Sequence, residues 1–64
     1  MSEKEFYRWL DVDCNTVLLS QKESFHDANG DYERTWVINN RGIKYSIVET
    51  NLNGVVSFGE PKEL

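Results

Sequence analysis

Cys14 and His26 are the chain's one thiol and one imidazole, the residue types that nucleophilic catalysis needs. Catalysis also requires the two groups to meet in one pocket beside a third group that orients them. Cys14 and His26 lie at opposite ends of an apolar stretch, about 30 Å apart if that stretch is an extended strand. The sequence therefore predicts that the protein is not an enzyme. Cys14 is interpreted as a buried apolar side chain.

Oxygen and nitrogen ligands cluster at His26, Asp27, Asn29 and Asp31, which is a composition typical of metal-binding loops. A calcium loop of the EF-hand type needs glycine sixth and glutamate twelfth, whereas counting from Asp27 puts Gly30 fourth and Ile38 twelfth. Asp, Asn and Gly are also the preferred residues of tight turns. We therefore expect a hairpin turn here, with no metal and no cofactor.

Tyr32, Trp36 and Tyr45 are spaced so that they share one face of a sheet, where sheet-based RNA-binding proteins stack bases. The same face also carries isoleucines, so these rings are core candidates first. Arg34 is the residue on that face that favours nucleic acid.

Charge divides the 64 residues into two unlike halves. Residues 1 to 33 hold eight acids and three bases, a net charge of −5, and residues 34 to 64 hold three acids and four bases, a net charge of +1. Four scattered cations do not form the basic stripe that phosphate binding needs, so we expect no direct contact with nucleic acid. An acidic half favours a basic protein partner, although the commoner use of such a half is as a solvated face that keeps the protein soluble.

The length predicts one domain over residues 1 to 64, because a chain this short has room for one hydrophobic core. A single cysteine cannot form an intrachain disulfide, and no stretch is apolar enough to span a bilayer or to resemble a signal peptide. We therefore expect a cytoplasmic protein. It would be a monomer or a weak homodimer that does not bind membranes.

A helix is predicted over residues 3 to 12. Ser2 and Glu5 have the S-x-x-E spacing of a capping box, and Phe6, Trp9 and Leu10 form one apolar face. From Thr16 onward β-branched and aromatic residues alternate with turn residues about every ten positions. Antiparallel strands are predicted over residues 16 to 25, 32 to 39, 43 to 50 and 55 to 58.

The fold class is therefore α+β, a short N-terminal helix packed on a four-stranded antiparallel meander. The helix is about 15 Å long and covers only part of one sheet face, so apolar sheet surface should remain open. Residues 59 to 64 have little to bury and are expected to form a frayed tail.

The segment that ends in Glu23-Ser24-Phe25 resembles the uracil-DNA glycosylase inhibitors of bacteriophages and staphylococcal mobile cassettes. In that family a helix leads into an apolar edge strand that ends in Glu-Ser-Ile. The resemblance covers about 25 residues, with Phe25 in place of the aliphatic residue, an additional Lys22, and no counterpart of the family's second helix. It implies DNA mimicry, in which Glu23 and Ser24 bind the enzyme's phosphate-recognising backbone. Asp27, Asp31 and Glu33 would extend the acidic face.

Three hypotheses remain open at this point. The first is a small phage or mobile-element inhibitor that binds the basic groove of a host DNA-processing enzyme through Glu23, Ser24, Phe25, Asp27, Asp31 and Glu33. The second is an assembly or regulatory module that binds a partner or itself through an exposed sheet face, with Val37, Val48 and Val55 as candidates, or through an edge strand. The third is a nucleic-acid binder that uses Tyr32, Arg34, Trp36 and Lys44, against which the net charge argues.

Overall fold

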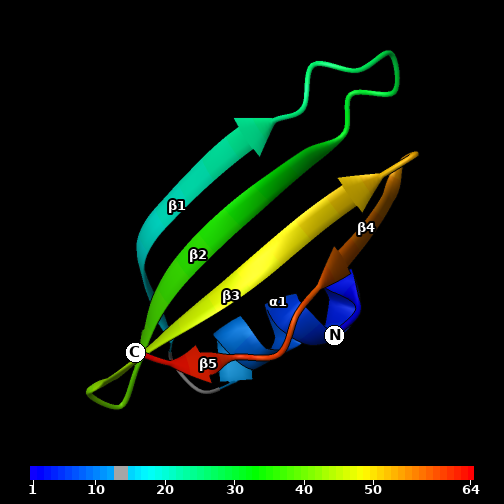
Figure 1. The fold of residues 1–64 in the computed structure, drawn as a ribbon. Helices are drawn as coiled ribbons and strands as arrows, with labels where there is room; N and C mark the ends of the chain where they lie inside the picture. Colours follow the sequence, from blue (N-terminus) through cyan, green and yellow to red (C-terminus); the bar gives the residue numbers. More distant parts are fainter. Residues whose placement is uncertain (13–14) are drawn as a thin grey trace.

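The predicted fold class is confirmed by a computed structural model, which describes residues 1–12 and 15–64 (Figure 1). One helix, α1 (Glu3–Val12), precedes an antiparallel sheet whose four main strands lie in the order β1-β2-β3-β4. The elements are β1 (Thr16–Ser24), β2 (Tyr32–Asn40), β3 (Ile43–Leu52), β4 (Val55–Phe58) and a short β5 (Lys62–Glu63). The interpretation of Cys14 as a core residue lies outside the described residues.

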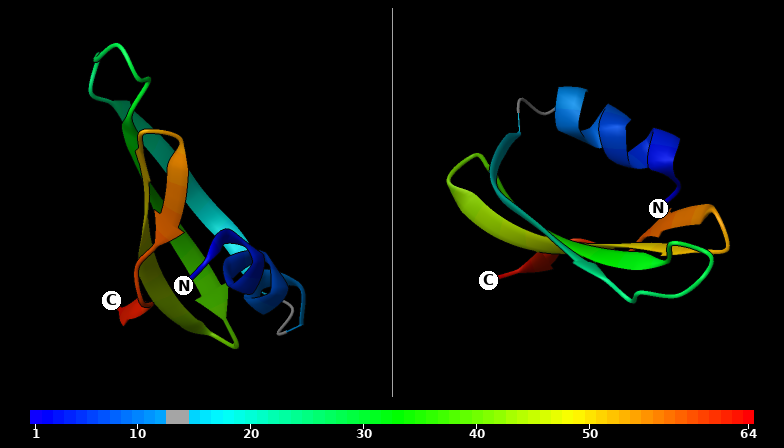
Figure 2. Two further views of the ribbon diagram at one scale, coloured as in Figure 1. Left: turned by 90° about the vertical axis from the view of Figure 1, so that its right-hand side faces the viewer. Right: turned by 90° about the horizontal axis from the view of Figure 1, so that it is seen from above.

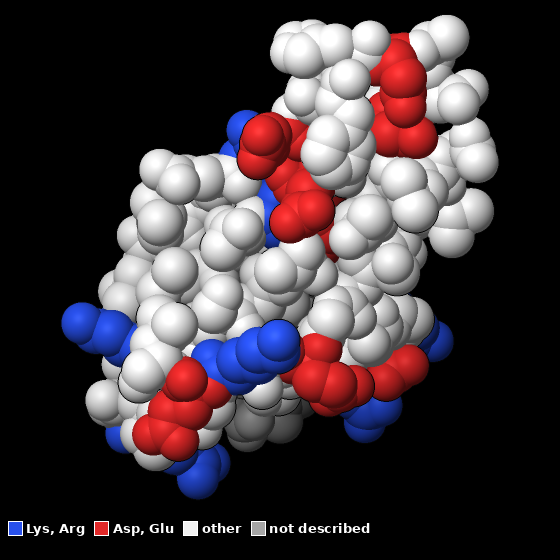
Figure 3. All heavy atoms as spheres, viewed as in Figure 1, with Lys and Arg blue, Asp and Glu red and all other residues white. Residues whose placement is uncertain are grey.

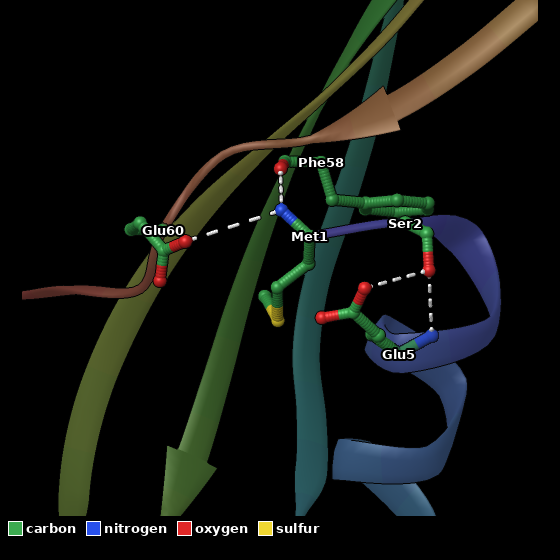
Figure 4. Close-up of polar contacts among 5 residues, drawn as sticks. All are labelled: Met1, Ser2, Glu5, Phe58 and Glu60. Atoms are coloured by element: carbon green, nitrogen blue, oxygen red, sulfur yellow. Dashed lines mark hydrogen bonds and ion pairs between the residues drawn. The ribbon is translucent and has the colours of Figure 1, made fainter.

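Helix α1 begins at the capping residue that the sequence indicates (Figure 4). The backbone N–H of Glu5 donates to Ser2 Oγ at 3.2 Å, and the Ser2 hydroxyl donates to Glu5 Oε1 at 3.1 Å. Met1 is tied to the end of β4, because its ammonium group donates to the Phe58 carbonyl at 2.6 Å and its carbonyl accepts from the Phe58 N–H at 3.0 Å. The start of the helix is thereby fixed to the sheet.

The helix covers one face of a curved sheet (Figure 2). Phe6 stacks on Phe58 with ring centroids 4.1 Å apart, and both side chains are buried with Ile38 and Ile47. Trp36 packs against this cluster from the same face, with its ring 5.2 Å from that of Phe6. The apolar residues of alternate sheet positions therefore meet the apolar face of the helix, as the periodicity predicts.

Two hairpins explain the close packing of β2, β3 and β4. Arg41 and Gly42 have φ angles of 52° and 85°, and Asn53 and Gly54 have φ angles of 55° and 81°. Positive φ at both central residues is the signature of the type I′ turn, whose twist matches that of the two strands it joins. These turns fix the β2–β3 and β3–β4 register.

The prediction that residues 59–64 form a frayed tail is wrong. Gly59 N–H donates to the Val48 carbonyl at 2.8 Å, Lys62–Glu63 pairs with β3 as β5, and Leu64 N–H donates to the Lys44 carbonyl at 3.0 Å. The segment continues along the edge of β3 beyond the end of β4. Backbone hydrogen bonds hold it there, so the side-chain pattern gave no sign of it.

Candidate functional site

Glu23 and Glu33 face one another across the β1–β2 pair. They are register partners, and both lie on the face of the sheet that the helix does not cover, opposite to the face that carries Trp36 and Ile38. Both are exposed. Like charges directly opposite one another on neighbouring strands oppose folding, so this pair is a local cost to stability.

The two carboxylates border a hollow on the surface of the β1–β2 hairpin. It has a volume of about 370 Å³ and is lined by Gln21, Lys22, Glu23, Glu33 and Thr35. Acidic side chains gather over the half of the helix-free face that is nearest the β1–β2 loop (Figure 3). Lysine and arginine side chains lie mostly toward the other end, together with further acids. The acids of residues 1–33 are thus divided between this acidic end and α1, which holds Glu3, Glu5 and Asp11 and lies away from the β1–β2 loop (Figures 1 and 2).

Asp27 organises the loop between β1 and β2. Its Oδ1 accepts the N–H of Asn29 at 3.1 Å and the N–H of Asp31 at 3.0 Å. The hydrogen bond from the Asp31 backbone is the main reason that the pKa of Asp27 lies below its ordinary value of 3.8. Asp27 therefore stays ionised at neutral pH, at the exposed tip of the acidic end.

Asp31 joins this loop to the β3–β4 turn. It is only 7% exposed, and its Oδ1 accepts the backbone N–H of Asn53 at 2.8 Å. The same residue closes the loop, because its carbonyl accepts the N–H of Phe25 at 3.0 Å. Asp31 shapes the acidic end and offers little surface to a partner.

Ser24 and Phe25 lie at the end of β1. Ser24 is the register partner of Tyr32 and so points to the opposite face from Glu23. Phe25 is 47% exposed where the chain leaves the strand. Consequently the structure brings Glu23 and Glu33 together, whereas a partner that contacts both Glu23 and Ser24 has to reach around the edge of β1.

A buried polar cluster on the helix-facing side of the sheet was missed by sequence reasoning. Glu49 is only 6% exposed, and it accepts hydrogen bonds from the Tyr32 hydroxyl at 2.5 Å and from Trp36 Nε1 at 2.9 Å. Arg34 Nε lies 3.6 Å from Glu49 Oε1, and Arg34 also donates to Ser20 Oγ at 2.8 Å. The signal for it was in the sequence: Glu49 continues the alternation of Tyr45 and Ile47, which puts an acid on an apolar face.

This cluster changes the chemistry of the face that nucleic acid would use. The hydrogen bond to Glu49 raises the pKa of Tyr32 above its ordinary value of 10.0, with burial and the negative charge of Glu49 acting in the same direction. Tyr32, Trp36 and Arg34 are all engaged by the same carboxylate. Lys44 lies on the opposite face, because its strand neighbour Tyr45 is the register partner of Ile38. The four residues of the nucleic-acid hypothesis therefore do not form one surface.

In residues 1–12 and 15–64 no group of three or more His, Cys, Asp or Glu residues is placed to hold a metal ion. That part of the chain also contains no helix with the length and apolar character needed to cross a membrane.

No protein-family model, curated protein or solved structure matches this chain. The resemblance at Glu23-Ser24-Phe25 to uracil-DNA glycosylase inhibitors stays a prediction.

Proposed function

We propose that this protein is a non-enzymatic inhibitor that binds the basic groove of a DNA-processing enzyme through the acidic end of its β1–β2 hairpin. It would act in the cytoplasm as a DNA mimic, of the kind that phages and mobile elements carry, and uracil-DNA glycosylase is the first target to test. The observation that carries the proposal is the register pair Glu23 and Glu33, two exposed carboxylates held face to face beside a hollow.

The energetics of that pair support the proposal. Neighbouring carboxylates repel one another in the free protein, and a cation of the partner placed between them would relieve the repulsion on binding. Exposed Asp27, held ionised by its turn, adds a third negative charge at the same end. Three carboxylates on one hydrogen-bonded hairpin present negative charge at set backbone positions, as a stretch of phosphates does, so less ordering is needed on binding than for an unpaired segment.

The acidic half also has a simpler use as a solvated face. Binding experiments separate the two uses, because a solubilising charge can be removed without losing a partner. The first experiment is inhibition of uracil excision from a uracil-containing oligonucleotide by purified uracil-DNA glycosylase, with this chain added in increasing amounts. Inhibition that weakens as salt rises from about 50 to 500 mM supports mimicry, since screened charges steer and hold less.

Absence of inhibition removes uracil-DNA glycosylase as the target and leaves the wider proposal to a capture experiment. Tagged protein is incubated with bacterial lysate at low salt, and excess duplex DNA is then added. A DNA-binding enzyme that the DNA displaces supports the proposal, because both ligands would occupy one groove. Partners that duplex DNA and high salt both leave in place contradict it.

The matched variants are the double substitution Glu23→Gln with Glu33→Gln and the control Glu63→Gln. Glu63 is an exposed acid in β5, on the other edge of the sheet from β1. The double variant should weaken binding by about 2 kcal/mol, roughly thirtyfold in Kd, and the control should leave it unchanged. Equal binding by all three proteins would show that the acidic end serves solubility.

A second candidate function rests on exposed aliphatic side chains of the helix-free face. Val55 and Leu52 are register partners that are 68% and 52% exposed, and Val48 lies on the same face. Patches of this kind serve as protein interfaces, here for a partner or for a second copy in a weak homodimer. Binding through this face would tolerate salt, and light scattering over a concentration series would reveal a homodimer.

A further inference from the structure

The outer edge of β1 is open along its whole length. β1 pairs with β2 on one side, and among the described residues no strand pairs with its other side, so β1 forms one margin of the sheet (Figure 1). All nine of its residues are exposed. An open edge presents unpaired N–H and C=O groups, which is the arrangement that accepts an added strand.

One loop hydrogen bond identifies the groups that face outward. Phe25 N–H donates to the Asp31 carbonyl across the hairpin, so the backbone of Phe25 faces β2. In an antiparallel pair successive residues point their N–H and C=O alternately toward and away from the neighbouring strand. Glu23 and Gln21 therefore face β2, and the backbone N–H and C=O groups of Ser20, Lys22 and Ser24 face outward.

Lysines and bulges commonly block strand edges, but those of β1 leave most of its edge accessible. A lysine on an edge strand usually hinders pairing, but Lys22 Nζ lies 4.4 Å from the centre of the Tyr32 ring, folded back over the sheet face. A bulge between Val17 and Leu19 disturbs the start of the strand. The regular portion of the edge is thus Leu19 to Ser24.

We propose that an extended, basic segment of the partner protein adds to this edge as an antiparallel strand. This strand addition rests on the proposed function, since both require a basic partner. An antiparallel strand would start beside Ser24 and end beside Leu19. Its first residues would lie next to Glu23 and the acidic hollow, and its last residues next to exposed Leu18 and Leu19. The expected sequence is therefore basic at its N-terminal half and aliphatic at its C-terminal half.

Charge argues for this occupant over a second copy of the chain. Each copy has a net charge of −4, concentrated in the half that contains β1, so pairing two β1 edges would bring like-charged hairpins together. A basic strand would instead place cations beside Glu23 and Glu33. An edge-bound strand also contacts both faces of β1, and it is thereby the kind of partner that reaches Glu23 and Ser24 at once.

The direct test is amide hydrogen exchange of the ¹⁵N-labelled protein with a synthetic peptide, acetyl-Thr-Arg-Thr-Arg-Thr-Val-Thr-Val-amide. Saturating peptide should slow exchange of the outward N–H groups of Ser20, Lys22 and Ser24 by at least about tenfold and leave that of Gln21 unchanged. The control peptide has glutamate in place of both arginines. Unchanged exchange with the arginine peptide overturns strand addition, and equal effects of the two peptides overturn the basic occupant. Slowing that grows with protein concentration alone assigns the edge to a second copy, which also overturns the proposal.

Ser20→Pro against Ser20→Ala separates this inference from the proposed function. Both variants lose the hydroxyl that accepts from Arg34, but only proline removes the outward N–H, which no ladder bond to β2 uses. Peptide affinity should fall at least tenfold for Ser20→Pro relative to Ser20→Ala. If Ser20→Pro fails to fold, the exchange experiment on the unaltered chain decides. If Ser20→Pro still binds the partner but the Glu23→Gln and Glu33→Gln double variant does not, the proposed function stands and the added strand is rejected. If the double variant still binds but Ser20→Pro does not, only the added strand stands.

Discussion

Replacement of Glu49 by glutamine should destabilise the protein more than any other single loss of charge in the described sheet. Glu49 is almost fully buried, and two neutral donors, the Tyr32 hydroxyl and Trp36 Nε1, bind its two oxygens. Glutamine has the same shape. Its carbonyl can accept from Trp36, and its amide can donate to the Tyr32 oxygen once the hydroxyl rotates. Both hydrogen bonds can therefore persist, but without the negative charge.

The expected magnitude follows from that difference. A hydrogen bond to a charged group contributes about 1.5 to 3 kcal/mol and one between neutral groups about 0.5 to 1.5 kcal/mol, so each bond loses about 1 kcal/mol. Arg34, which lies 3.6 Å from Glu49, is about one third exposed and can be hydrated, so loss of the Arg34–Glu49 ion pair adds little. The total is about 2 kcal/mol. In a domain of this size it corresponds to a fall in Tm of about 8 to 16 °C.

Thermal unfolding followed by circular dichroism measures the effect, and Glu63→Gln is the control because it removes an exposed carboxylate whose register partner, Tyr45, is uncharged. Tyr32→Phe, alone and combined with Glu49→Gln, completes a double-mutant cycle. The two substitutions should be clearly non-additive, since each weakens the same hydrogen bond. A Tm of Glu49→Gln within about 3 °C of the unaltered protein would refute the reasoning, because it would mean that the carboxylate is solvated and contributes no charge-assisted bonds.

Three further effects are expected. Glu33→Thr should raise stability by about 0.5 kcal/mol in a thermal melt, since it removes the repulsion from Glu23, and a destabilised variant would contradict the like-charge argument. The pKa of Tyr32 is raised, so the stabilisation from its protonated hydroxyl is complete below pH 10.0 and is lost as pH rises through the folded-state pKa. In an ultraviolet titration of the tyrosines, Tyr32→Phe should therefore lack the most alkaline step of the unaltered protein. The pKa of Asp27 is lowered, so the stabilisation from its ionised carboxylate is complete above pH 3.8 and is lost as pH falls through the folded-state pKa. Between pH 5 and pH 2 the Tm of Asp27→Ala should therefore fall less than that of the unaltered protein. Equal falls in Tm would show that other groups cause the sensitivity to acid.

The helix and the strands were predictable because their signals are local. The Ser2 and Glu5 pair marks the start of α1, and Arg41-Gly42 and Asn53-Gly54 mark turns in which glycine supplies a positive φ. Alternation along β2 placed Trp36 and Ile38 on the face that the helix covers. The segment after Phe58 carries no such signal. Its position depends on the free edge of β3, which exists only after the other strands have paired.

The acidic end was predictable in its composition but not in its geometry. Glu23 and Glu33 are acids in two strands, and only the register of the β1–β2 hairpin decides that they are opposite one another. That register depends on a loop in which His26 has a positive φ of 57° and Asp27 binds two backbone N–H groups. The hydrogen bond from Asn53 to Asp31 spans two separate turns, and no sequence pattern indicates such a contact.

The core and the proposed binding surface lie at opposite ends of this elongated molecule, which measures 40 × 20 × 14 Å. Phe6, Phe58, Ile38 and Ile47 form the core beneath the helix, and none of them belongs to β1 or to the loop that follows it. The β1–β2 hairpin extends beyond that core and carries an unfavourable carboxylate pair that the core has to offset. Substitution of the exposed hairpin residues should therefore change partner binding with little loss of folding, whereas the reverse holds for the core. That separation lets the charge and edge variants report on binding rather than on folding.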